Sequence, residues 1–274
     1  MPDPVRRVVT GPAGDLVVWD HPGGGPAVLL LHGIGNYGRV WDDVADAVGG
    51  RLRLVAPDAR GHGDSFAPAD GYAPADFVAD AVTILDALGL ARVVVVGHSM
   101  GGGHAFALQQ AHPERCAGLA LIDIGPDLEP EGRARSLRLS TERPASFSDA
   151  DAAEAYLRET SPGYTDQVYA DRVRWLFHRR DGALVWRSSP AALRQIFAAG
   201  AQPGAWAALA SVPVPLLLVR GSRSTHLGRA TAERMVRTAP RARLIELDAG
   251  HNVQLDQPAA LAEAIVAFAS EVAG

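Results

Sequence analysis

A serine framed by glycines is the first feature of this 274-residue chain that could do chemistry. The stretch GHSMG at 97–101 has the spacing G-x-S-x-G, follows the apolar run RVVVVG at 92–97 and opens a helix-like segment. In that context the glycines permit a strained turn, and Ser99 stands at the N-terminus of a helix, where free N–H groups favour negative charge. We therefore predict that Ser99 is a nucleophile rather than a passive residue of a glycine-rich turn.

A histidine and two backbone amides would complete the chemistry of such a serine. His251 lies in DAGHN at 248–252, beyond the last strand-like run, and is the expected general base. HGIG at 32–35 follows another buried run, and its small residues let the backbone approach a ligand. The N–H groups of Ile34 and Met100 are then expected to form an oxyanion hole. We expect His32 to brace this loop rather than to react.

The elements that must position these groups alternate along the chain. Apolar runs indicate strands at 15–19, 27–33, 52–58, 92–97, 118–125, 215–221 and 243–248, and helical spacing indicates helices at 74–89, 228–239 and 258–272. This alternation predicts an α/β fold, with a mostly parallel sheet and helices on both faces. Residues 126–211 show amphipathic helical segments without strand-like runs. We expect a core domain at 1–125 and 212–274, interrupted by a helical cap at 126–211.

Together these stretches resemble the α/β-hydrolase superfamily, in particular its esterase, lactonase and epoxide-hydrolase-like group. The matching residues are LLLHGIG, PDARGHGDS, VVGHSMGG, LALIDIGP and ELDAGHNVQLDQP, in the family's order and over almost the whole chain. The resemblance implies an α/β-hydrolase fold with an eight-stranded type of sheet, and it indicates the fold more specifically than the substrate. Asp58 and Arg60 are interpreted as structural residues of a loop near the site.

The place that the resemblance implies for the triad acid holds no carboxylate. That place is Ser224, and a serine cannot stabilise an imidazolium as a carboxylate can. We predict that Asp123, at the end of the strand after the nucleophile, takes the role, as in some similar hydrolases. The alternatives are that Asp123 only caps the start of the cap, or that Asp248, three residues before His251, is the acid. Weaker candidates on the cap linker are Asp127 and Glu129.

Composition excludes several kinds of chemistry and partner. All 26 basic residues are Arg and none is Lys, which removes Schiff-base catalysis and a P-loop lysine. The net charge of -5 favours neither nucleic acid nor an acidic membrane surface. The sequence has no signal-peptide pattern, no apolar run of membrane-spanning length and one cysteine, Cys116, so we expect a cytoplasmic monomer or homodimer without an internal disulfide. Neither metal-ligand spacing nor a dinucleotide fingerprint is present, so no metal and no cofactor are expected.

These features predict a serine hydrolase that cleaves a small, modestly hydrophobic ester or lactone through an acyl-enzyme. Hydrolysis of a C–C bond stays open. So does a cofactor-independent ring-cleaving dioxygenase, in which His251 and Asp123 would deprotonate an aromatic substrate. A non-catalytic binding module is disfavoured because the serine, histidine and acid positions are all filled.

The substrate pocket is expected to be mostly apolar and to draw on two loops and on aromatic residues of the cap. The candidates for its lining are His32, Gly33, Tyr37, His98, Trp175, Trp186 and Trp206. Phe177 and Phe197 are further aromatic residues of the cap. Arg223 and His226 lie where the usual acid is missing, and they are candidates to hold a carboxylate.

Overall fold

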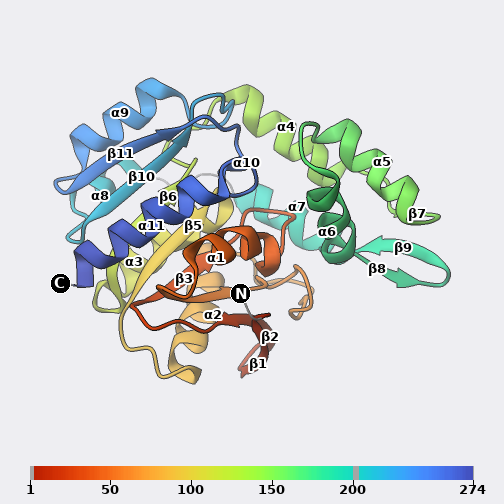
Figure 1. Ribbon diagram of the computed structural model, residues 1–274, viewed down its shortest axis with the longest axis horizontal. Helices are drawn as coiled ribbons and strands as arrows, with labels where there is room; N and C mark the ends of the chain where they lie inside the picture. Colours follow the sequence, from red (N-terminus) through yellow and green to blue (C-terminus); the bar gives the residue numbers. More distant parts are fainter. Residues whose placement is uncertain (1–2, 200–203, 274) are drawn as a thin grey trace.

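An eight-stranded sheet runs through the computed structural model, which describes residues 3–199 and 204–273 (Figure 1). Its strands are β1 (Val5–Gly11), β2 (Gly14–His21), β3 (Ala27–Leu31), β4 (Arg53–Pro57), β5 (Val93–His98), β6 (Cys116–Ile122), β10 (Leu216–Gly221) and β11 (Ala242–Leu247). Their spatial order is β1-β2-β4-β3-β5-β6-β10-β11. The pairs β1–β2 and β2–β4 are antiparallel and the other neighbouring pairs are parallel, which confirms the predicted mostly parallel sheet.

Burial explains which strands could be recognised from the sequence. Every residue of β5, VVVVGH, is buried, as expected for a parallel strand covered on both faces. The edge strand β1, VRRVVTG, leaves most of its side chains exposed, Val5 and Val8 among them. It was not predicted because it lacks a continuous apolar run.

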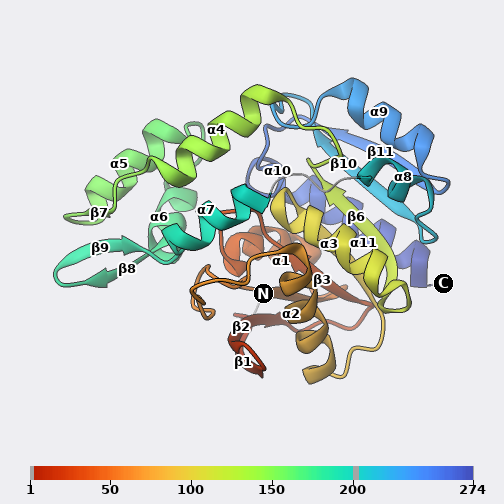
Figure 2. The same cartoon turned by 180° about the vertical axis from the view of Figure 1, so that it is seen from behind.

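Helices cover both faces of this sheet, as predicted. On one face lie α1 (Asp42–Val48) and α11 (Pro258–Ala273), and on the other lie α2 (Pro74–Ala87), α3 (Met100–Ala111), α8 (Ala205–Ala210) and α9 (Arg229–Thr238) (Figures 1 and 2). Short helical turns complete the core as η1 (Gly38–Trp41), η2 (Pro113–Arg115) and α10 (Val253–Asp256). Each fully buried side chain, such as Leu85 of α2 or Phe268 of α11, contributes about 1.5–3 kcal/mol of apolar burial to this packing.

The segment between β6 and β10 forms a second group of elements, set beyond one end of the large sheet (Figure 1). Its helices in this group are α4 (Pro130–Thr141), α5 (Ala150–Thr160), α6 (Asp166–Leu176) and α7 (Pro190–Ala199). The last helix before β10, α8, packs instead against the large sheet. The expectation that this segment contains only helices is wrong. A small antiparallel sheet lies within it, formed by β7 (Ser146–Phe147), β8 (Phe177–Arg180) and β9 (Ala183–Trp186).

The small sheet depends on a tight turn that interrupts the helical pattern. Asp181 and Gly182 join β8 to β9, and both have positive φ, 50° and 83°. Two such residues form the turn that suits the twist of a β-hairpin, and Asp-Gly is a preferred sequence for it. The run DQVYADRVRWLFHRR therefore ends its helix at Leu176 and continues as a strand.

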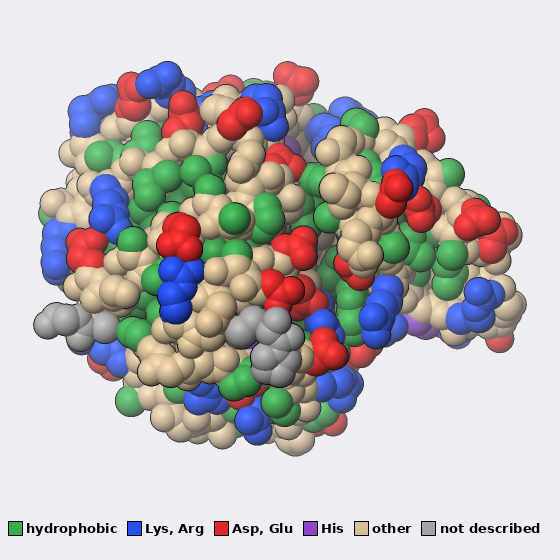
Figure 3. Space-filling model, viewed as in Figure 1, with side chains coloured by type: hydrophobic (Ala, Val, Ile, Leu, Met, Phe, Trp, Pro, Cys, Tyr) green, Lys and Arg blue, Asp and Glu red, His purple; other side chains and the backbone are tan. Residues whose placement is uncertain are grey.

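Charge on the surface is mixed rather than concentrated. Figure 3 shows acidic and basic side chains interspersed over one face of the molecule. Within residues 3–199 and 204–273, no helix is both long enough and apolar enough to cross a membrane.

Candidate active site

Ser99 occupies the strained turn between β5 and α3. Its φ of 51° and ψ of -119° lie in a region that residues with a side chain rarely adopt. A Cβ on Gly97 would collide with the carbonyl of Gly101, and a Cβ on Gly101 would collide with the carbonyl of Leu31 in β3. The two glycines therefore allow the close packing of strand and helix that keeps Ser99 in this conformation.

A line of hydrogen bonds connects three of the residues selected from the sequence. His251 Nε2 lies 3.0 Å from Ser99 Oγ, and His251 Nδ1 lies 2.7 Å from Asp123 Oδ2. This geometry fits an imidazole whose Nδ1–H donates to the carboxylate and whose Nε2 accepts the serine proton. A hydroxyl, a base and a buried carboxylate in this order can perform nucleophilic catalysis.

The order of the strands explains why an acid after β6 can reach the histidine. β6 lies between the nucleophile strand β5 and β10, and the Ser99 N–H donates to the carbonyl of Ile122, the last residue of β6, at 3.1 Å. Asp123 follows directly, and its N–H donates to the carbonyl of Val219 in β10 at 2.8 Å. Its carboxylate therefore lies beneath the loop after β11, which carries His251.

Ser224, at the position where an acid was expected, is hydrogen-bonded to Asp123. Its hydroxyl donates to Oδ2 of that carboxylate, and the Gly221 N–H donates to Oδ1 at 3.1 Å. Ser224 Oγ also accepts the N–H groups of His226 and Leu227, at 3.0 and 3.4 Å. The serine thus holds the carboxylate of the candidate acid Asp123, a contact that the sequence reasoning missed.

Burial sets the protonation of the pair. Asp123 is fully buried, which raises the pKa of its carboxyl, while the hydrogen bonds from Ser224 and Gly221 lower it. Burial, and then the Arg135 guanidinium, lower the pKa of His251 below its ordinary value. A lowered pKa keeps the imidazole neutral at pH 7, the state in which it can accept a proton from Ser99.

Two further histidines hold the catalytic candidate in place. The His226 ring stacks on the His251 ring with centroids 3.6 Å apart and planes 12° apart, and His226 Nε2 lies 2.7 Å from Ser136 Oγ. His98 Nε2 donates to the His251 carbonyl at 2.8 Å. Burial lowers the pKa of both supporting rings, so they are neutral beside His251 at pH 7.

The two amides proposed for an oxyanion hole both lie beside Ser99. Met100 is the first residue of α3, so its N–H has no acceptor within the helix. Ile34 follows β3 in a loop fixed by its neighbours, since the Gly35 N–H donates to His62 Nε2 at 3.0 Å. His32 braces the same loop as expected, because its Nε2 accepts the Ala59 N–H at 3.0 Å.

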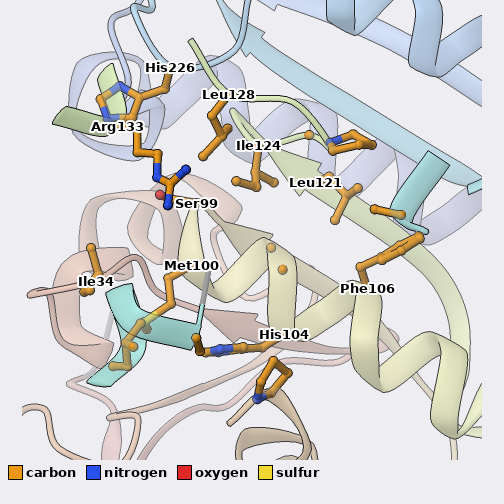
Figure 4. Close-up of a pocket in the computed structure, with 18 of the residues that line it drawn as sticks. Ile34, Ser99, Met100, His104, Phe106, Leu121, Ile124, Leu128, Arg133 and His226 are labelled. Atoms are coloured by element: carbon orange, nitrogen blue, oxygen red, sulfur yellow. The ribbon is translucent and has the colours of Figure 1, made fainter. Parts of the chain in front are cut away.

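Two cavities meet at Ser99. The first, of about 240 Å³, is mainly apolar, and Figure 4 shows Leu121, Ile124 and Leu128 on one side of it. The second, of about 130 Å³, is mainly polar and reaches His251. Residues that line both cavities are Ile34, Ser99, Ser136 and His226.

Several pocket candidates line these cavities and others do not. Gly33, His98 and Trp186 line the polar cavity, and Phe197 lines the apolar one. Leu121, Ile124, Arg143 and Arg172 are lining residues that the sequence reasoning missed. The first two lie in or just after a buried strand, and the arginines lie in segments that resemble a solvated cap surface.

The expected placement is wrong for Tyr37, Trp175 and Trp206, and His32 also lies away from both cavities. Tyr37 is 4% exposed and packs into the core of the large sheet. Trp175 packs edge-on against Trp19, with ring centroids 5.3 Å apart. Trp206 donates to Asp127 Oδ2 at 2.9 Å and stacks under Arg234, so polar partners hold it away from the pocket.

The other polar residues discussed from the sequence have structural partners. Asp248 pairs with Arg223 on the surface, which removes both from the site, where Arg223 was a candidate to hold a carboxylate. Asp58 Oδ1 accepts the Gly38 N–H at 2.6 Å, and Arg60 pairs with Asp80 at 2.6 Å. Among the described residues, no group of His, Cys, Asp and Glu could hold a metal ion.

Comparisons with known proteins place this geometry in context. The chain matches the model of the Alpha/beta hydrolase family over residues 28–264. It is similar to the crystal structure of E-2-(acetamidomethylene)succinate hydrolase, with a TM-score of 0.89 and 28% identity, covering 96% of this chain and 98% of that one. Lipase LipV of Mycobacterium tuberculosis is 29% identical over 256 residues, which are 92% of this chain and 96% of the lipase. An uncharacterized protein of the same organism is 36% identical over 103 residues, 38% of this chain and 30% of that protein, so the match spans under a third of that relative.

Proposed function

Because the chain belongs to the alpha/beta hydrolase family, we propose that it hydrolyses a small ester or lactone through a Ser99–His251–Asp123 triad. The observation that carries the proposal is the unbroken line of hydrogen bonds from Ser99 Oγ through the imidazole to the buried carboxylate. The lowered pKa of His251 supports the neutral base that the first step needs, and Asp123 Oδ2 lies 2.7 Å from His251 Nδ1, where it can accept the Nδ1–H.

In the first half-reaction Ser99 Oγ attacks the substrate carbonyl carbon and His251 Nε2 takes the hydroxyl proton. Asp123 stabilises the imidazolium that forms and keeps the ring in its productive orientation. The N–H groups of Ile34 and Met100 stabilise the negative oxygen, at about 3–4 kcal/mol for each donor. His251 then gives its proton to the leaving alcohol oxygen, and an acyl-enzyme remains on Ser99.

In the second half-reaction a water molecule attacks the acyl carbon while His251 accepts one of its protons. The same two amides stabilise the second tetrahedral intermediate, and collapse returns the proton to Ser99 Oγ and releases a carboxylic acid. For a lactone, the alcohol and the acid are the two ends of one product.

We also propose that residues 126–211 act as a cap over the core formed by 1–125 and 212–274. Both cavities lie between this segment and the core, since each has lining residues from both parts. The apolar cavity would take the hydrophobic part of the substrate, and its lining by Ile124, Phe106 and Phe197 supports a modestly hydrophobic group.

A second candidate is hydrolysis of a small amide by the same residues. It is favoured by the likeness to E-2-(acetamidomethylene)succinate hydrolase over nearly the full length of both chains. The dioxygenase alternative gains less support, because it leaves the 3.0 Å contact between His251 and Ser99 without a chemical role.

The proposal is tested by trapping the acyl-enzyme. The protein is mixed with 4-nitrophenyl acetate, quenched in acid during turnover and weighed intact by mass spectrometry. We expect the wild type to gain one acetyl group, located on Ser99 by peptide mapping, and the Ser99→Ala variant to gain none. Release of 4-nitrophenol at the same rate by Ser99→Ala would refute the proposal, because hydrolysis would then not pass through this serine.

A further inference from the structure

The polar cavity beside Ser99 is lined by three arginines. Arg135 comes from α4, Arg143 from the loop after it and Arg172 from α6. No Asp or Glu is among the described residues that line this cavity. Three cations around one small space, without an acid among them, leave it strongly positive.

Arg172 is the most unusual of the three. Its side chain is 9% exposed, and its Nε and Nη1 are buried without a hydrogen-bond partner. Within the described part of the chain it forms no ion pair, and its guanidinium carbon lies 5.6 Å from the centroid of the Tyr164 ring. A buried charge without a partner is strongly destabilising, so such a residue is expected where a ligand supplies the missing charge.

Arg143 is held in an orientation that leaves part of its guanidinium for a ligand. Its Nη2 donates to the carbonyl and to Oγ of Ser188, both at 3.0 Å, and its guanidinium lies 4.0 Å from the centre of the Trp186 ring. These partners are neutral. Burial lowers the pKa of Arg143 to about 10, so the side chain stays cationic at pH 7.

Two buried arginines elsewhere in the molecule are each paired with an acidic residue. Arg60 and Arg220 are 4% and 7% exposed, and they pair with Asp80 and Glu246, each at 2.6 Å. On the apolar side of Ser99, Figure 4 shows Arg133 reaching from α4 toward the serine. Arginines thus line both cavities, three of them the polar one and Arg133 the apolar one.

We infer that the polar cavity is a carboxylate subsite, so that the substrate of this enzyme is an anion. A substrate carboxylate would accept hydrogen bonds from Arg172 and Arg143 while its scissile carbonyl lies at Ser99 and its apolar part fills the larger cavity. A planar carboxylate suits the paired donors of a guanidinium, and about 130 Å³ suits a short acidic arm. The inference rests on the proposed function, because it places the carboxylate relative to the Ser99 nucleophile.

Matched esters test the subsite. Mono(4-nitrophenyl) glutarate carries a free carboxylate, and 4-nitrophenyl methyl glutarate is its neutral counterpart. We expect the wild type to prefer the anionic ester in kcat/KM by about 10- to 100-fold, the value of a hydrogen bond to a charged group. Arg172→Gln should remove most of this preference by lowering kcat/KM for the anionic ester, so that the ratio of the two kcat/KM values falls toward one.

A control variant and a binding measurement make the result specific. Arg174→Gln changes an exposed arginine on the same helix that lines neither cavity, and it should keep the preference. Glutarate should raise the melting temperature of Ser99→Ala protein but not that of Ser99→Ala/Arg172→Gln. The binding arm needs no catalysis, and the loss of an unpaired buried charge is not expected to unfold Arg172→Gln.

The outcomes separate the two proposals. Hydrolysis of both esters that depends on Ser99 but shows no preference, together with no effect of glutarate on melting, would overturn the carboxylate subsite and leave the proposed function intact. Hydrolysis that persists in Ser99→Ala would overturn the proposed function, whereas protection by glutarate that requires Arg172 would still support an anion site.

Discussion

We expect the substitution Asp123→Asn to abolish most of the activity, and a second substitution, Ser224→Asp, to restore part of it. Asp123 Oδ2 accepts hydrogen bonds from both His251 and Ser224, and Oδ1 accepts the Gly221 N–H. In Asp123→Asn the side chain has an NH₂ group in place of one carboxylate oxygen. At least one of these N–H or O–H donors then faces another donor and loses its hydrogen bond, and the imidazole loses its charged partner. We expect kcat/KM to fall by about 10,000-fold, equivalent to about 5.4 kcal/mol.

The second substitution, Ser224→Asp, returns a carboxylate to the same neighbourhood. The Ser224 side chain already reaches the carboxylate that His251 uses, and it is fixed by the N–H groups of His226 and Leu227. A charge-assisted hydrogen bond contributes about 1.5–3 kcal/mol, so Asp123→Asn/Ser224→Asp should recover about 10- to 100-fold of the lost rate.

The assay is kcat/KM for a 4-nitrophenyl ester, with circular dichroism to show that each variant is folded. Asp123→Asn/Ser224→Asn is the matched control, because it has the same size at position 224 without the charge. Equally slow but folded Asp and Asn double variants would show that a carboxylate at position 224 cannot serve His251. Wild-type activity in Asp123→Asn alone would show that Asp123 is not the acid.

Three further results are expected. Burial lowers the pKa of His251, and the neutral base is lost only as the pH falls through that pKa. The acid limb of kcat/KM against pH should therefore lie below pH 6.5. An acid limb above pH 6.5 would contradict the assignment of His251 as the base. Gly101→Ala should lower the free energy of unfolding in urea by about 1–3 kcal/mol, because its Cβ meets the Leu31 carbonyl. Gly103→Ala, with open space around it, should leave that free energy unchanged. Equal effects of the two variants would count against the tight turn. Phe197→Ala should raise KM for esters with longer acyl chains more than for acetates, and a uniform effect would show that the apolar cavity does not hold that part of the substrate.

The sequence was most informative where one local pattern forces one geometry. GHSMG after a buried strand predicted the strained turn, since few other structures combine those glycines with a helix start. A serine at position 224 predicted that the acid is Asp123, and the structure brings that carboxylate to His251. The catalytic roles of these residues remain our proposal.

Features that depend on tertiary contacts were missed. The Asp181–Gly182 hairpin was hidden within an amphipathic pattern, because a short exposed strand and a helix end look alike in such a run. Arg143 and Arg172 resembled ordinary solvated residues of a cap, since nothing local shows that a charge will be buried without an acid beside it. Three of the four tryptophans and tyrosines proposed for the pocket pack elsewhere, because aromatic residues stabilise cores as readily as they line pockets.

Labelling of Ser99 by a fluorophosphonate reports which carboxylate orients His251. The rate of adduct formation is followed by intact mass for the wild type, Ser99→Ala, Asp123→Asn and Asp248→Asn. We predict one adduct on the wild type, none on Ser99→Ala, strongly slowed labelling of Asp123→Asn and normal labelling of Asp248→Asn, whose carboxylate pairs with Arg223 on the surface. Normal labelling of Asp123→Asn together with loss of labelling in Asp248→Asn would show that Asp123 is not the acid and place the acid after β11.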